Sequence, residues 1–136
     1  MGTFAAIGIA GSGLGVHRRW LDAIADNLAN VNTVASTDDE AFQARYIVAQ
    51  ANATEGGQTG GVHVAGAVLG SAQGRLVYEP EHALADEDGY VRYPDIDMSS
   101  QMSQLILAQR GYQANAAVVD RARDMYSTAL TIGRSS

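Results

Sequence analysis

The C-terminal part of the chain carries a strict seven-residue hydrophobic repeat, which limits the folds open to the sequence. From residue 98 onward, a large side chain returns at every seventh position: Met98, Leu105, Tyr112, Val119 and Tyr126. This spacing is typical of a helix that packs lengthwise against another helix. A helix over residues 97–132 would be about 54 Å long at 1.5 Å per residue. That is too long to fold back into a compact domain of 136 residues, so the sequence predicts a helix with a partner along its length.

The same segment also carries a second stripe of small or amide-bearing residues. These residues follow each large side chain by three positions and are Gln101, Ala108, Asn115, Ala122 and Ala129. Alternating large and small residues allow a partner helix to approach closely. We expect Asp97 to cap the start of the helix, with Pro94 just outside it, and Gly133 to follow its end.

A similar repeat occupies the N-terminal segment. Its large members recur every seven residues and are Ile7, Leu14, Leu21 and Leu28. Glycines crowd the first half of this segment, at positions 8, 11, 13 and 15. Each interior glycine costs about 0.8–1 kcal/mol of helix propensity relative to alanine. Residues 2–15 should therefore be frayed until another element packs on them.

The middle of the chain, residues 36–94, changes to a pattern of short strands and turns. Valine and tyrosine runs at 62–68, 75–80 and 86–94 are bounded by Gly, Asp-Gly or Pro. The segment 55–61 (EGGQTGG) and the Asp88-Gly89 pair predict turns. We therefore expect an α+β fold: an N-terminal helical segment (1–35), a β-rich, partly irregular middle lobe (36–96) and a C-terminal helix (97–136). The first and third should form one coiled-coil-like helical domain, with the middle zone projecting as a separate lobe.

Charge and composition exclude several classes of protein. The net charge of −6 argues against a nucleic-acid binder, which needs a basic surface. With no cysteine, the chain has no disulfide, thiolate metal site or cysteine nucleophile. No charged segment precedes Arg18, and no apolar stretch approaches the roughly 20 residues of a membrane span. If the protein leaves the cytoplasm, we expect a route without a cleaved signal peptide.

Candidate chemical motifs are weak. The segment 8–15 (GIAGSGLG) fits neither G-x-G-x-x-G nor a Gly-Lys-Ser/Thr phosphate loop. Residues 85–95 (ADEDGYVRYPD) resemble a calcium loop, but Leu84 stands at its first ligand position, so a solvated turn is favoured. The histidines, at positions 17, 63 and 82, lack metal-ligand spacing, and no G-x-S-x-G motif is present. We predict no enzyme activity, no cofactor, no metal site and no small-molecule substrate.

Amide side chains occur in both helical repeats. Asn27, Asn30 and Asn32 lie at the end of the first, where they could simply terminate a helix. Gln109 and Asn115 lie in the second, and buried amides on a helical seam can fix register and partner choice. We therefore also consider a register-critical assembly surface. Its predicted members are Leu14, Leu21, Ile24, Asn27, Leu28, Asn30, Val31, Leu105, Ala108, Arg110, Tyr112, Asn115, Val119, Ala122 and Tyr126.

Three segments resemble a known family. Residues 12–33 (SGLGVHRRWLDAIADNLANVNT) resemble the N-terminal signature of bacterial flagellar axial proteins, with its Asn-x-Ala-Asn-x-x-Thr ending at positions 27–33. Residues 101–133 resemble that family's C-terminal helix, with Arg110, Tyr112, Ala114 and Asn115 in its Arg-x-Tyr-x-Ala-Asn core. Residues 75–97 resemble the segment before this helix in a proximal rod protein, although Asp95 replaces the asparagine usual there. Just after this segment, Ser99-Ser100 replace the two residues that usually precede the methionine of the helix.

The resemblance implies a structural role. A proximal rod subunit would polymerise helically through its terminal helices and transmit torque from motor to hook. Its partners would be itself, other flagellar rod proteins, basal-body components and the flagellar type III export apparatus. It would lie in the basal body, in the periplasmic part of the cell envelope. The alternatives are the B-type proximal rod protein of the same family, against which residues 75–97 decide, and a non-flagellar helical adaptor or an unrecognised enzyme.

Overall fold

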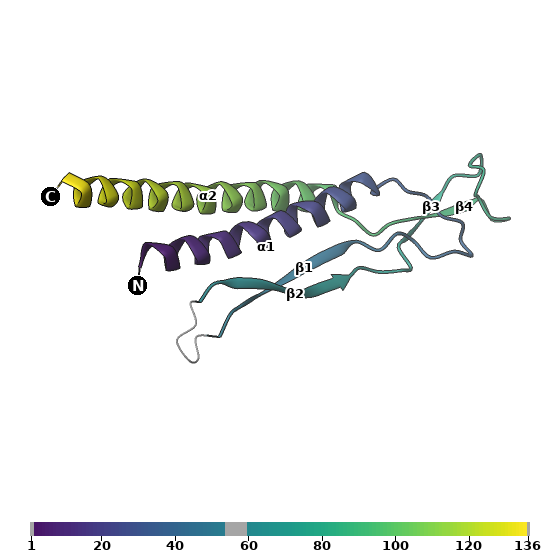
Figure 1. Ribbon diagram of the computed structural model, residues 1–136. Helices are drawn as coiled ribbons and strands as arrows, with labels where there is room; N and C mark the ends of the chain where they lie inside the picture. The colour runs from purple at the N-terminus through teal and green to yellow at the C-terminus, as the bar shows by residue number, and fades with distance from the viewer. Residues whose placement is uncertain (1, 54–59, 136) are drawn as a thin grey trace.

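The computed structural model describes residues 2–53 and 60–135 of the chain. Two long helices lie side by side and antiparallel, so that the start of the first and the end of the second lie at the same end of the molecule (Figure 1). The predicted α+β class is confirmed. In chain order the elements are α1 (Thr3–Ala29), β1 (Arg45–Ala51), β2 (Val62–Leu69), β3 (Arg75–Tyr78), β4 (Tyr90–Tyr93) and α2 (Met98–Ser135).

Helix α1 is the central layer of the molecule. Helix α2 packs on one side of it and the β1–β2 hairpin on the other, and no close backbone approach links α2 to the described strands β1 and β2 (Figure 1). The buried residues of α1 are mostly small: Ala10, Gly13, Val16, Ala23, Ile24 and Asn27. Both neighbours pack on the glycine-rich half of α1, which supplies the packing that this segment needs to remain helical.

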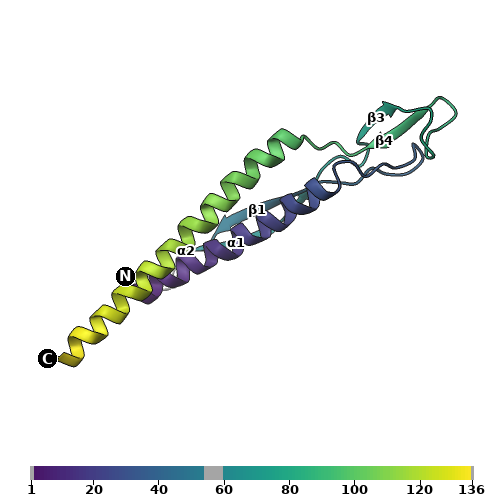
Figure 2. The ribbon, with the colours of Figure 1, turned by 90° about the horizontal axis from the view of Figure 1, so that it is seen from above.

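Helix α2 begins where the sequence predicts. The Oδ1 atom of Asp97 accepts a hydrogen bond from the Ser99 backbone N–H at 2.9 Å, so Asp97 is the N-cap. The predicted stop at Gly133 is wrong, because α2 continues to Ser135. Gly133 is not among the glycines with positive φ in the described chain, and a glycine with helical φ does not end a helix. With 38 residues against 27 in α1, α2 extends past the start of α1 (Figure 2).

The middle zone forms two separate antiparallel hairpins, β1–β2 and β3–β4. The expectation of one separate lobe is wrong for β1–β2, because its inner face packs on α1. Ile47 and Ala49 of β1 line one hollow together with Val16 and Trp20 of α1, and the Ser12 Oγ accepts a hydrogen bond from the Val62 N–H at 3.0 Å. Strands at 62–69, 75–78 and 90–93 match the predicted runs, whereas β1 was not predicted. The expected turn at 55–61 lies mostly outside the described residues.

The β3–β4 hairpin lies beyond the end of the helix pair (Figure 2). Together with residues 34–44 and its connecting segments it forms the tip, which comprises residues 34–44 and 71–96. Arg92 holds the tip together: its backbone pairs with Ala35, and its guanidinium donates to the carbonyl oxygens of Thr37, at 2.7 Å, and Gln73. Val91, Pro94 and Ile96 are buried in the small core of the tip.

Gly74, in the tip, has a φ of +57°, and a Cβ built there would overlap the carbonyl oxygen of Tyr93. Gly74→Ala should therefore lower the free energy of unfolding by more than about 1 kcal/mol. Gly15→Ala is the matched control, because its Cβ would meet open space on α1 and should raise stability by about 0.5–1 kcal/mol. Urea unfolding followed by circular dichroism measures both. Equal effects of the two substitutions would contradict this account of the tip.

Candidate assembly interface

A buried amide group joins the three layers of the fold. The Asn27 Nδ2 atom donates to the Gln101 Oε1 of α2 at 3.1 Å and to the Arg45 carbonyl oxygen of β1 at 2.9 Å. Its Oδ1 accepts the Arg45 N–H at 2.8 Å. Asn27 is only 1% exposed and Gln101 only 2%. Because a buried amide without partners costs about 1–3 kcal/mol, this set of hydrogen bonds favours one alignment of α1, α2 and β1.

Further along the helix pair, glycines on each helix make room for side chains of the other. A Cβ at Gly13 of α1 would lie 2.7 Å from the Asn115 Oδ1 of α2, and a Cβ at Gly111 of α2 would overlap the His17 ring of α1. The His17 Nδ1 donates to the Gly13 carbonyl oxygen at 2.8 Å, and the Asn115 Nδ2 donates to the Gly111 carbonyl oxygen at 2.9 Å. The two glycines thus allow close, reciprocal packing.

These contacts also show how the helices are aligned. Asn27 of α1 faces Gln101 of α2, and His17, ten residues earlier in α1, faces Gly111, ten residues later in α2. The two helices are therefore antiparallel with matching steps. The pairing ends at Phe4 and Tyr126, whose rings meet edge to face with centroids 5.0 Å apart. The small-residue stripe of α2 therefore faces α1, and its residues Gln101, Ala108 and Ala122 are buried.

Asn30 has a different role from Asn27. Its Nδ2 donates to the Asp26 carbonyl oxygen at 2.9 Å, and its Oδ1 accepts the Thr33 hydroxyl at 3.0 Å. It is the C-cap residue of α1, so helix termination is the correct interpretation at this position. The two asparagines of the motif thus have different roles: Asn27 fixes the alignment of the layers, and Asn30 ends the helix.

The residues predicted for the interface fall into three groups. Four are buried within the chain: Ile24, Asn27, Ala108 and Ala122. Three are exposed: Arg110, Tyr112 and Tyr126. The others are half-buried: Leu14, Leu21, Leu28, Asn30, Val31, Leu105, Asn115 and Val119. The structure thus uses much of the predicted seam for the contact between α1 and α2.

Helix α2 also carries large apolar side chains away from α1. Leu107, Val118 and Met125 are 58%, 46% and 67% exposed, and their spacing of eleven and seven residues places them along one side of a helix. Met98, Met102 and Ile106, about half exposed, follow each other at four-residue intervals along another side. Sequence reasoning missed both stripes, because it followed the strict seven-residue repeat.

The outer face of the β1–β2 hairpin is a third uncovered apolar surface. Tyr46 and Val68 are cross-strand partners on this face, and Val48 follows two residues after Tyr46 on the same side of β1. All three are exposed. The sequence signal for this face was the Tyr46-Ile47-Val48 run, which has strong β propensity.

Polar and charged side chains line the grooves between α1 and the hairpin. One groove between α1 and the hairpin is lined by Ser12, Arg19 and His63 among its polar residues. A second is lined by the charged residues Arg19, Asp22, Asp26 and Arg45. Asp26 and Arg45 form an ion pair there. Within residues 2–53 and 60–135, no three His, Cys, Asp or Glu side chains are grouped to hold a metal ion.

The suspected calcium loop is a hydrogen-bonded turn. The Asp86 Oδ1 accepts the backbone N–H groups of Tyr90, at 2.8 Å, and Asp88, at 3.0 Å. The hydrogen bond from Tyr90 is the main reason why the pKa of Asp86 lies below its usual value. Gly89, with φ +84°, closes this turn. The two backbone hydrogen bonds give the Asp86 carboxylate its partners within the loop.

Comparison with known proteins decides the family. A family model described as "Flagellar basal body rod FlgEFG protein C-terminal" matches residues 87–132. The flagellar basal-body rod protein FlgC of Escherichia coli O6:H1 is 40% identical, over 93% of this chain and 94% of its own. The FlgC of Salmonella typhimurium gives the same three values, and that of Borreliella burgdorferi is 29% identical over 97% and 98%.

The chain belongs to the FlgC family. Its function is accordingly that of a structural subunit of the flagellar basal-body rod. The sequence-based choice of the FlgC group over the B-type proximal rod protein and over a non-flagellar adaptor is confirmed. The FlgC relatives are named flagellar basal-body rod proteins, which supports a location in the basal body for this chain.

Asn27→Ala should lower the free energy of unfolding by about 2–3 kcal/mol, because it leaves the Gln101 amide and the Arg45 backbone without their buried partner. Asn32→Ala is the matched control, since Asn32 is exposed and its loss should change stability by less than about 0.5 kcal/mol. A double-mutant cycle with Gln101→Ala should give a coupling of at least about 0.5 kcal/mol. Additive effects would mean that the Asn27–Gln101 contact does not fix the helix pair.

Proposed function

We propose that this chain builds the proximal rod by packing the uncovered faces of α2 and of the β1–β2 hairpin against neighbouring subunits. The supporting observation is an excess of surface. The chain exposes 9098 Å², whereas a compact monomer of 14.3 kDa exposes about 6800 Å². Much of the excess comes from the flat, layered arrangement in which α1 alone is covered on two sides. Neighbouring subunits would bury part of this surface.

In this proposal the predicted interface residues divide according to their burial. Ile24, Asn27, Ala108 and Ala122 hold the subunit together through the α1–α2 seam. The exposed residues Arg110, Tyr112 and Tyr126, with the Leu107–Val118–Met125 stripe, contact neighbours. The half-buried members, such as Leu105 and Val119, lie at the edge of the seam and contribute to both.

A rod requires contacts that do not close on themselves. Different faces of each subunit meet in a heterologous contact, and repetition of such a contact builds a helical assembly. The partners proposed are further copies of the chain, other rod proteins and basal-body components. The long α2 helix, continuous over 38 residues, is suited to transmitting torque from motor to hook as part of a packed tube.

We further propose export through the flagellar type III apparatus without a cleaved signal peptide, and a final position in the periplasmic part of the basal body. Several features favour a chain that unfolds for transit: four glycines between positions 8 and 15, two small hairpins, and a subunit with little internal core. The cost of ordering such a chain is met when it assembles. Among the described residues, no helix is both long and apolar enough to span a membrane. We propose a purely structural role, without catalysis, cofactor or nucleic-acid binding.

Leu107→Asp and Val118→Asp test the uncovered face of α2. Each should abolish swimming in a strain that lacks the native gene, because a charge would be buried in a dry subunit contact. Each should leave the circular dichroism spectrum and the free energy of unfolding of the purified chain nearly unchanged, since both side chains are exposed. Soft-agar motility and electron microscopy of basal bodies measure the effect on assembly.

Ser103→Asp is the control, because it introduces the same charge at an exposed polar position of the same helix, and it should preserve swimming. Normal rods with both Leu107→Asp and Val118→Asp would contradict the proposed contact. Complete motility in a strain without the gene would contradict the rod function itself.

A further inference from the structure

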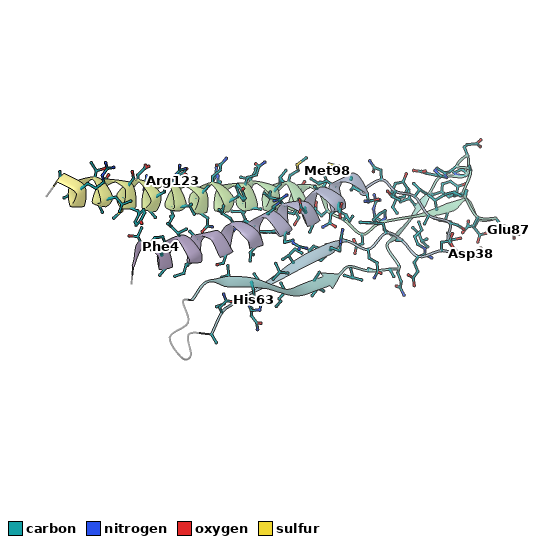
Figure 3. The ribbon with its side chains drawn as sticks, in the orientation of Figure 1. Phe4, Asp38, His63, Glu87, Met98 and Arg123 are labelled. Carbon is teal, nitrogen blue, oxygen red and sulfur yellow. The ribbon has the colours of Figure 1, made fainter. Side chains whose placement is uncertain are left out.

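Charge is distributed unevenly along the long axis of the molecule. The tip, residues 34–44 and 71–96, has nine acidic side chains and two arginines, a net side-chain charge of −7. The opposite end, which we call the helical end, comprises residues 2–21 of α1 and 105–135 of α2. It has six arginines and two aspartates, a net side-chain charge of +4. Figure 3 shows Asp38 and Glu87 at one extreme of the molecule, with Phe4 and Arg123 toward the other.

These charges are not compensated within the subunit. In the described part of the chain the single ion pair joins Arg45 to Asp26, and both residues lie between the two ends. The arginines of the helical end and the carboxylates of the tip therefore have no ion-pair partner among the described residues. Opposite charges at the two ends of an elongated subunit attract when copies line up head to tail.

The helical end has an apolar centre among its arginines. Phe4 is 69% exposed although its ring meets that of Tyr126. Leu130 lies one turn beyond Tyr126 on the same face of α2 and is 51% exposed. Helix α1 covers this face of α2 only as far as its own first turn at Thr3. Arg123 and Arg134 flank the centre along α2.

The tip has a matching centre among its acids. The rings of Tyr78 and Tyr90 meet edge to face with centroids 5.4 Å apart, and both are exposed. Leu84 lies exposed in the loop between β3 and β4, and the same loop carries Glu81 and Glu87, also exposed. An apolar centre with a charged rim is the usual composition of a protein–protein contact.

We infer that the tip of one copy docks on the helical end of a second copy, with the Tyr78–Tyr90 pair against Phe4, Tyr126 and Leu130. The occupant is a second copy of this chain, because the tip supplies both the apolar area and the opposite charge that the helical end requires. The contact is heterologous, so repetition gives a row of subunits and not a closed dimer. This inference rests on the proposed assembly function and adds to it the axial contact and its electrostatic basis.

Salt dependence is the first test. Sedimentation velocity of the purified full chain at about 20 mM NaCl should show a mass above the 14.3 kDa monomer that rises with protein concentration. At about 500 mM NaCl the association should weaken at least about tenfold, because screening shortens the range of attraction between exposed charges. A chain that stays monomeric at low salt up to the highest soluble concentration would overturn the inference.

Charge reversal with complementation is the sharper test. Glu81→Arg/Glu87→Arg reverses charges at the tip, and Arg123→Glu/Arg134→Glu reverses charges at the helical end. Each variant alone should associate at least about tenfold more weakly than the native chain. An equimolar mixture should recover association, because in each contact between the two variants positions 81 and 87 again carry the charge opposite to that of positions 123 and 134. Recovery on mixing also shows that both variants are folded.

Asp22→Arg is the control, since Asp22 is exposed and lies outside both the tip and the helical end, about five helical turns along α1 from Phe4, and it should leave association nearly unchanged. Native-like association of both double variants, or no recovery in their mixture, would overturn the head-to-tail contact. A strain that carries either double variant and still builds rods would also show that this contact is dispensable, while the proposed rod function would stand. Loss of rods only with Leu107→Asp or Val118→Asp would likewise show that assembly does not need the head-to-tail contact.

Discussion

The hydrogen bonds of Asn27 set the alignment on which the rest of the subunit depends. The α1–α2 seam is built largely from alanine and glycine, whose uniform shape gives little resistance to sliding. A shift by one heptad would place Asn27 opposite Ala108, which has no polar side-chain atom to pair with it. The amide would then be buried without a partner at a cost of about 1–3 kcal/mol. A polar contact among small residues thus gives the seam a unique register, as a single buried asparagine does in coiled coils.

The same side chain connects this register to the hairpin. An isolated two-stranded hairpin is only marginally stable in water. Among the described residues, β1 and β2 have no third strand beside them and no close backbone approach to α2. The hairpin is ordered by α1, through Asn27 at the start of β1 and through Ser12 at the start of β2. Helix α1 therefore positions both of its neighbours. This explains how a chain with so small a core is ordered while the outer faces of α2 and the hairpin stay uncovered.

The sequence was sufficient to predict the α2 helix, its Asp97 cap and the pairing of the two terminal helices. It was not sufficient to assign faces. The repeat of Met98, Leu105 and Tyr112 has the larger side chains, yet the small stripe of Gln101 and Ala108 is the one buried against α1. The choice depends on glycines of both helices, which allow backbones to approach and so favour small partners. Asn27 was recognised as unusual, but one of its partners is the backbone of β1, a strand that was not predicted.

The position of the contact between Asn27 and Gln101 also determines where α2 is no longer covered by α1. Asn27 lies near the C-terminal end of α1 and Gln101 near the N-terminal end of α2, so the two helices are pinned close to the tip. Because α2 has 38 residues and α1 has 27, the difference in length appears at the other end, around Tyr126 and Leu130. The apolar face at that end is thus a consequence of the register fixed at Asn27. A substitution that shifted the register by a heptad would move this face as well, and would change the surface offered to the next subunit without changing any residue in it.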